Sequence, residues 1–264
     1  MSDLITNAFA CTDKRACLVA FITAGFPHAD STPAMLSAIA EAGADIIEIG
    51  VPFSDPMADG PAIQRSSEVA LANGMTLKKT IAATAAFRNT NTTVPLVLMG
   101  YANSFLNHPG GAAGLAQAAQ QANINGLIVV DLADEDRANW KRHLAPAGVS
   151  LVNLVAPTTN ESRLQQIAND AEGFLYAISL KGVTGAGNLD VENVAYNLRA
   201  VKQIATVPVV AGFGIRTPEH ALQLANHADG VVIGSKLVEI AEAAADPPAE
   251  VGAFIKQMAT TLAH

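Results

Sequence analysis

The sequence predicts an α/β fold, a closed (β/α)8 barrel with an extra N-terminal helix. Short runs rich in β-branched residues recur along the 264 residues, and alanine-rich amphipathic stretches lie between them. Strand–helix alternation that continues to eight strands favours a barrel that closes on itself. An open doubly wound sheet would need a glycine fingerprint after its first strand, and the segment ITAGFPH does not supply one.

The strands are expected where apolar residues run without interruption, which is typical of strands buried on both faces of a parallel sheet. These runs are CLVAFIT (17–23), DIIEIG (45–50), PLVLMGY (95–101), GLIVVD (126–131), SLVNLV (150–155), FLYAIS (174–179), VPVVAG (207–212) and GVVIG (230–234). Helices are expected between them, for example over STPAMLSAIAEAG and TPEHALQLANHA, which end near a glycine or a polar break. Residues 2–12 are expected to cap the barrel floor, and residues from about 248 to 262 to form the closing helix.

No linker or charge block divides the chain, so residues 1–264 are expected to form a single barrel domain. The widest gap between strands follows the second one, and extra length in a barrel usually lies in loops at the catalytic face. A glycine-rich stretch, LKGVTGAGNLD (180–190), follows the sixth strand and is interpreted as a mobile lid.

Composition limits the classes of partner. The formal net charge is -8, which leaves no electrostatic footprint for nucleic acid or an anionic membrane. The N-terminus lacks the layout of a signal peptide, and no apolar run has the length of a membrane span. Cys11 and Cys17 are too few for a disulfide scaffold. The simplest expectation is a cytoplasmic protein.

Glu48 is the strongest candidate for acid–base chemistry. It lies between Ile47 and Ile49 in the second strand, so its side chain points to the opposite face from theirs. A carboxyl group inside the barrel would have its pKa raised by desolvation toward the range useful for catalysis. The alternative is a structural carboxylate paired with a lysine or arginine, but no basic residue is near it in sequence.

Two aspartates follow in the next loop. The sequences SDP and ADG are strong turn formers, and that role accounts for most of what Asp55 does. For Asp59 the local sequence leaves a turn role and a catalytic role about equally supported.

Glycines after the seventh and eighth strands predict a phosphate site. They lie in GFGI (212–215) and GS (234–235), the second of which opens a helix. Barrel enzymes often bind phosphate between these two loops, where backbone N–H groups and the helix dipole supply the donors. Gly185 in the loop after the sixth strand is a further candidate donor.

Other side chains have simpler explanations. Lys181 could form a Schiff base as in some barrel aldolases, but its place on a loop favours exposure. Tyr176 has the parity to point into the barrel, although core packing would explain it as well. The six histidines show no metal-ligand spacing, so no metal site is expected.

The segment EIGVPFSDPMADGP (48–61) resembles the signature of the tryptophan synthase alpha chain family. The similarity continues in order through FITAGFP (21–27), LMGYAN (98–103), VVDL (129–132), APTT (156–159), SLKGVTGAGN (179–188), GFGI and GS. It therefore covers essentially the whole chain.

The resemblance implies a lyase that cleaves indole-3-glycerol phosphate to indole and glyceraldehyde 3-phosphate by a retro-aldol reaction. Glu48 matches the general acid/base, and Asp59 matches the carboxylate that receives the indole N–H. Further matches suggest substrate-binding residues: Phe21 as an apolar wall, Tyr176 beside the glutamate, Thr184 as a lid threonine, and Gly185, Phe213, Gly214, Gly234 and Ser235 around the phosphate. Lys236 departs from the small apolar residue that the family often has. A cation there could strengthen phosphate binding or simply point to solvent, and we favour solvent.

The family works as an α2β2 complex with a beta chain that carries pyridoxal phosphate, so this chain is expected to hold no cofactor. Residues Pro52–Pro56 and the segment near Asn103 are expected to face that partner. Three alternatives remain: a free-standing lyase that releases indole, a Schiff-base aldolase that uses Lys181, and a regulatory subunit without activity. Intact Glu48 and Asp59 argue against the last of these.

Overall fold

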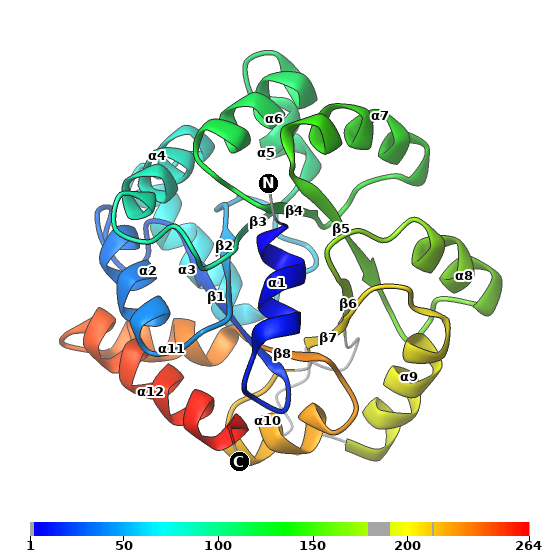
Figure 1. Cartoon of the computed structure of the whole chain (residues 1–264). Coiled ribbons are helices and arrows are strands. Elements are labelled where there is room, and N and C mark those ends of the chain that lie inside the picture. Colours follow the sequence, from blue (N-terminus) through cyan, green and yellow to red (C-terminus); the bar gives the residue numbers. More distant parts are fainter. Residues whose placement is uncertain (1–2, 179–190, 213, 264) are drawn as a thin grey trace.

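Eight parallel strands form a closed barrel in the order β1 to β8, and helices surround it (Figure 1). The computed structural model describes residues 3–178, 191–212 and 214–263. The predicted fold class is confirmed, with each strand at its expected place or shorter by one or two residues at an end. The strands are β1 (Cys17–Thr23), β2 (Ile46–Gly50), β3 (Leu96–Gly100), β4 (Gly126–Val129), β5 (Ser150–Val155), β6 (Leu175–Ile178), β7 (Val209–Gly212) and β8 (Gly230–Ile233).

The helices lie outside the strands, except for the first. They are α1 (Leu4–Cys11), α2 (Thr32–Glu41), α3 (Pro61–Ala72), α4 (Leu77–Arg88), α5 (Ala102–Leu106), α6 (Gly111–Gln121), α7 (Asp134–Leu144), α8 (Glu161–Asn169), α9 (Val191–Ile204), α10 (Pro218–Ala225), α11 (Ser235–Ala243) and α12 (Pro247–Leu262). Among the described residues, no helix is long and apolar enough to cross a membrane.

Helix α1 lies across the barrel floor, as expected for the N-terminal segment (Figure 1). Its Ile5 is fully buried and lies close to Gly126 and Gly173, near the starts of β4 and β6. A methyl group added at these glycines would come within 3.2 and 3.5 Å of the Ile5 side chain, respectively. Asp3 caps the helix by accepting a hydrogen bond from the Ile5 amide at 3.0 Å. The opposite end of the barrel, where the strands finish, is left open for a site.

The long gap after β2 holds more regular structure than the sequence suggested. Residues 51–60 form the loop that follows β2, and the helices α3 and α4 fill most of the remaining gap, with short connections at 73–76 and 89–95. Helix α3 begins at Pro61, and proline is favoured at a first helical position because it has no N–H to leave unpaired. The loop with the signature aspartates is therefore short and anchored at both ends.

A repeated arrangement fixes the barrel floor. A residue that lies just before each even-numbered strand uses a side-chain oxygen to accept a hydrogen bond. The donor is a backbone N–H at the start of the odd-numbered strand that precedes it in the chain. The four bonds are Leu18 N to Asp45 (2.7 Å), Leu96 N to Asn125 (2.9 Å), Leu151 N to Glu172 (3.0 Å) and Val209 N to Asp229 (2.9 Å). Each acceptor also contacts a cation: Lys14, Arg88, Lys141 and Lys202 respectively.

Substituting Asp45 with alanine is expected to lower the free energy of unfolding by about 2 to 3 kcal/mol, because it removes a charge-assisted hydrogen bond and leaves the Leu18 amide unpaired. Urea denaturation measures the change. Asp13 is the matched control, since it also lies near Lys14, at 3.7 Å, but its side chain is 88% exposed. Asp13→Ala should change stability by less than about 0.5 kcal/mol. Equal effects of the two substitutions would contradict a structural role for the floor contacts.

Candidate active site

Glu48 lies inside the barrel. It pairs in register with Phe21 of β1 and Val97 of β3. Phe21, Thr23 and Gly50, which share its face of the sheet, line a cavity at the carboxyl ends of the strands. Glu48 is thus one layer below the cavity floor, on the same face, and it is fully buried.

The Glu48 carboxyl group is shielded from water. Neither of its oxygens has a hydrogen-bond partner within the described part of the chain. Burial raises its pKa from 4.5 to about 8, because a charged carboxylate would lose its hydration there. At neutral pH the group is therefore protonated, and it is close to the range in which it can both give and take a proton.

Asp59 lies in the turn at the end of the loop after β2, and it also lines the cavity. Its backbone N–H bonds the Pro56 carbonyl at 3.0 Å, which makes a turn. Its carboxylate accepts a hydrogen bond from Tyr101 Oη at 3.0 Å and also lines the cavity. Burial raises the pKa of Asp59, and the bond from Tyr101 offsets only part of this rise by stabilising the charged form.

Two aromatic rings narrow the interior, and two glycines make room for them. A side chain at Gly50 would come within 2.6 Å of the Phe21 ring, and one at Gly212 within 2.2 Å of the Tyr176 ring. Tyr176 is 8% exposed. Burial raises the pKa of its phenol, and the nearby Glu48 and Asp59 raise it further. Tyr176 therefore lies within electrostatic range of both carboxyl groups.

The cavity contains residues that sequence reasoning missed. It is lined by Phe21, Thr23, Gly50, Val51, Asp59, Ile63, Ser67, Met99, Gly100, Tyr101 and Val130. Glu48 and Tyr176 are not among its lining residues. Tyr101 is the omission that matters most, because its hydroxyl binds Asp59; its place directly after the third strand was a signal that could have found it.

The described part of the predicted phosphate site lies at the ends of β7 and β8, which are neighbours in the barrel. Gly214 is exposed and has a φ of 65°, a left-handed conformation that favours glycine. Gly234 precedes α11, whose first residue is Ser235, so the free amides of that helix start beside it. Lys236 is partly buried in the first turn rather than fully in solvent.

Thr184, Gly185, Phe213 and Lys181 lie outside the described residues, as does the proposed lid 180–190.

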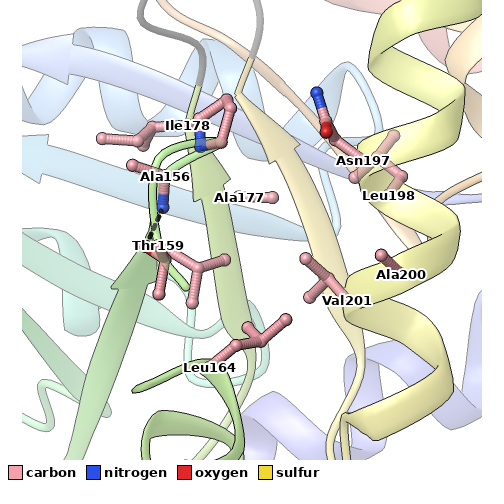
Figure 2. Close-up of a pocket in the computed structure, with 11 residues that line it drawn as sticks. Ala156, Thr159, Leu164, Ala177, Ile178, Asn197, Leu198, Ala200 and Val201 are labelled. Carbon is pink, nitrogen blue, oxygen red and sulfur yellow. Dashed lines mark hydrogen bonds between the residues drawn. The ribbon is translucent and has the colours of Figure 1, made fainter. Parts of the chain in front are cut away.

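A second pocket lies outside the barrel, between β5 and β6 on one side and α8 and α9 on the other (Figure 2). Its walls are mostly aliphatic, and they include Leu164, Leu198 and Val201. The Ala156 amide donates to Thr159 Oγ1 at 3.1 Å on its rim. Among the described residues, no ionisable side chain lines this pocket, whereas Glu48 and Asp59 belong to the barrel interior and its cavity. Within the described ranges, no group of three or more His, Cys, Asp or Glu side chains is arranged to hold a metal.

Comparison with known proteins identifies the family. The sequence profile described as tryptophan synthase alpha chain matches residues 8–263. The chain belongs to the tryptophan synthase alpha chain family. The alpha chain of Burkholderia multivorans is 48% identical over 259 residues, which cover 97% of this chain and 95% of that protein. The alpha chain of Nitrosomonas europaea is 45% identical over 249 residues, 94% of this chain and 90% of that one.

Solved structures agree with the family. The crystal structure of tryptophan synthase subunit alpha from Legionella pneumophila superposes with a TM-score of 0.90 at 34% identity, and the match covers 99% of both chains. The resemblance read from the signature segment is confirmed. The chain is an alpha subunit of tryptophan synthase, a lyase of tryptophan biosynthesis, and an alpha subunit implies a beta-chain partner.

Proposed function

We propose that the chain cleaves indole-3-glycerol phosphate to indole and glyceraldehyde 3-phosphate with Glu48 and Asp59 as its two catalytic carboxyl groups. One observation carries the assignment. A fully buried glutamate without a hydrogen-bond partner among the described residues lies below a cavity that an aspartate lines. Desolvation and hydrogen bonding separate the two groups, so that one serves as acid and the other remains available as an anion.

Glu48 supplies and then recovers a proton. In its protonated form it gives the proton to C3 of the indole ring, and positive charge develops at the ring nitrogen. As a carboxylate it then takes the proton of the adjacent side-chain hydroxyl. The electron pair of the breaking carbon–carbon bond returns to the ring, while the hydroxyl carbon becomes the aldehyde. The protonated indole ring is its own electron sink, so the step needs no metal or Schiff base.

Asp59 has a different task. As an anion it accepts the indole N–H and stabilises the charge that grows on the nitrogen. Phe21 and Tyr176 would hold the ring between them, with Tyr176 beside Glu48. This division explains why Asp59 has a hydrogen-bond donor while Glu48 has none among the described residues, since the donor favours the ionised form.

The phosphate would bind at the loops after β7 and β8. Gly214, Gly234 and Ser235 offer backbone N–H groups and the N-terminus of α11. Thr184, Gly185 and Phe213 complete the proposed set. Local donors of this kind suit a chain whose net charge is -8, because no basic field is available to attract the ligand.

We also propose an α2β2 complex in which only the beta chain carries pyridoxal phosphate. Two exposed apolar side chains mark the proposed contact surface: Met57, 78% exposed, in the loop after β2, and Leu106, 51% exposed, at the end of α5. They lie beside the segments around Pro52–Pro56 and Asn103. A cytoplasmic location and a single domain over residues 1–264 are parts of the same proposal.

An indole-formation assay with and without the cognate beta chain tests the function. We expect weak cleavage of indole-3-glycerol phosphate by the isolated chain and a marked increase, roughly tenfold or more, on mixing, in the range of typical coupling energies. Full activity without the partner would favour the free-standing lyase. Absence of cleavage in both samples would contradict the assignment. Borohydride trapping of substrate on Lys181 would favour the Schiff-base aldolase.

A further inference from the structure

Tyr101 fastens the loop that carries Asp59. It directly follows β3 and is 3% exposed. Its hydroxyl donates to Asp59 Oδ2 at 3.0 Å and accepts from the Ala58 N–H at 3.0 Å. Its ring stacks on Phe53, with the centroids 5.0 Å apart and the planes at 25°. The Tyr101 side chain thus contacts the loop 51–60 near its start, at Phe53, and near its end, at Ala58 and Asp59.

The same residue begins the helix α5. The Tyr101 carbonyl accepts from the Ser104 N–H at 3.0 Å, and the neighbouring Ala102 N–H donates to Asp131 Oδ1 at 2.6 Å. Asp131 follows β4, so α5 is fixed to two strand ends. Because the Tyr101 backbone is the N-cap of α5, a rotation or shift of this five-residue helix must move the phenol ring.

We propose that Tyr101 is a positioning residue through which α5 sets the place and the charge of Asp59. The inference rests on the proposed function, in which α5 faces the beta chain. Docking of the partner on α5 would move Tyr101, which lies in the continuous segment β3–Tyr101–α5, and would reach the catalytic aspartate through the hydrogen bond from Tyr101 to Asp59. Tyr101 itself acts on Asp59 rather than on the reacting atoms.

Loss of the hydroxyl has two separate consequences. Asp59 would lose the bond that favours its anion, so burial would raise its pKa further. Loop 51–60 would also lose the acceptor of the Ala58 N–H and with it the link to α5. The other titratable groups around this contact are Asp131, which interacts with Tyr101, and Tyr176 and Glu48, which lie within electrostatic range of one another. The substitution Tyr101→Phe keeps all three of these side chains.

The test is Tyr101→Phe in the full chain, which keeps the ring on Phe53, with Tyr196→Phe as the control. Tyr196 is 71% exposed on α9 and has no part in the site. We expect kcat/KM of Tyr101→Phe at pH 7 to fall roughly tenfold to hundredfold, as for loss of a bond to a charged group. Its acidic limb in the pH profile should move to higher pH, and its activation by the beta chain should fall several-fold. The control should retain the wild-type values.

A second variant, Asp131→Ala, separates the two consequences. It breaks the anchor of α5 at Ala102 and leaves the bond from Tyr101 to Asp59. We expect reduced activation by the beta chain with an unmoved acidic limb. An unchanged acidic limb or activation factor in folded Tyr101→Phe, or unchanged activation in Asp131→Ala, would overturn the inference. Wild-type protein that releases no indole would instead overturn the proposed function on which it rests.

Discussion

Glu48→Gln is expected to lower kcat for indole formation by about 10³- to 10⁴-fold, near the upper end of what general acid–base catalysis contributes, because one group handles both proton transfers. Glutamine keeps the shape of the side chain but can neither give nor take the proton. Steady-state kinetics at pH 7 measure the loss, with the beta chain present.

The matched control is Glu41→Gln, which makes the same chemical change at an exposed position at the end of α2. It should leave kcat within about twofold of wild type, as for a surface substitution away from the site. A Glu48→Gln variant with more than about a hundredth of wild-type activity would show that another group carries the proton, since a general acid–base group typically contributes at least about 10²-fold.

The same substitution is expected to change how stability depends on pH. The pKa of Glu48 rises from 4.5 in the unfolded chain to about 8 in the folded one. The stabilising contribution of this raised carboxyl pKa to the free energy of unfolding is fully present below about pH 4.5, and it is lost as the pH rises to about 8. The loss is on the order of 5 kcal/mol, at about 1.4 kcal/mol per pH unit. Glu48→Gln has no such group to ionise.

Urea denaturation at pH 5 and pH 9 measures this difference. Relative to wild type, Glu48→Gln should gain several kcal/mol in free energy of unfolding between the two pH values, whereas Glu41→Gln should follow wild type. Parallel pH curves for Glu48→Gln and wild type would mean that the buried carboxyl group titrates normally. The proposed acid would then be ionised at neutral pH and unable to protonate the substrate.

The sequence was sufficient to predict the barrel and the orientation of Glu48, because both depend on local periodicity. Apolar runs mark strands buried on both faces, and the alternation of side chains in β2 sets Glu48 apart from its two isoleucine neighbours. The extra helix α3 was not predicted from its weakly patterned sequence PAIQRSSEVALA. Its start at Pro61 is the one local signal that indicated it.

Contacts between distant segments could not be read from local patterns. Asp59 and Tyr101 are 42 residues apart, and nothing in either neighbourhood indicates that their side chains meet. The repeated acceptors of the barrel floor are of the same kind, since Asp45 binds the Leu18 amide 27 residues away. Such pairs depend on which residues strand register brings together. The catalytic role that we propose for Asp59 is supported by family membership together with its place in the cavity.

The roles of Glu48 and Asp59 can be tested by a crystal structure with a non-cleavable analogue, an indole joined to a phosphate through a chain without hydroxyl groups. We expect the indole N–H to lie on Asp59, C3 of the ring within reach of Glu48, and the phosphate on the amides near Gly214 and Ser235. Indole bound instead in the aliphatic pocket between α8 and α9, or turned so that its N–H lies far from Asp59, would contradict these roles.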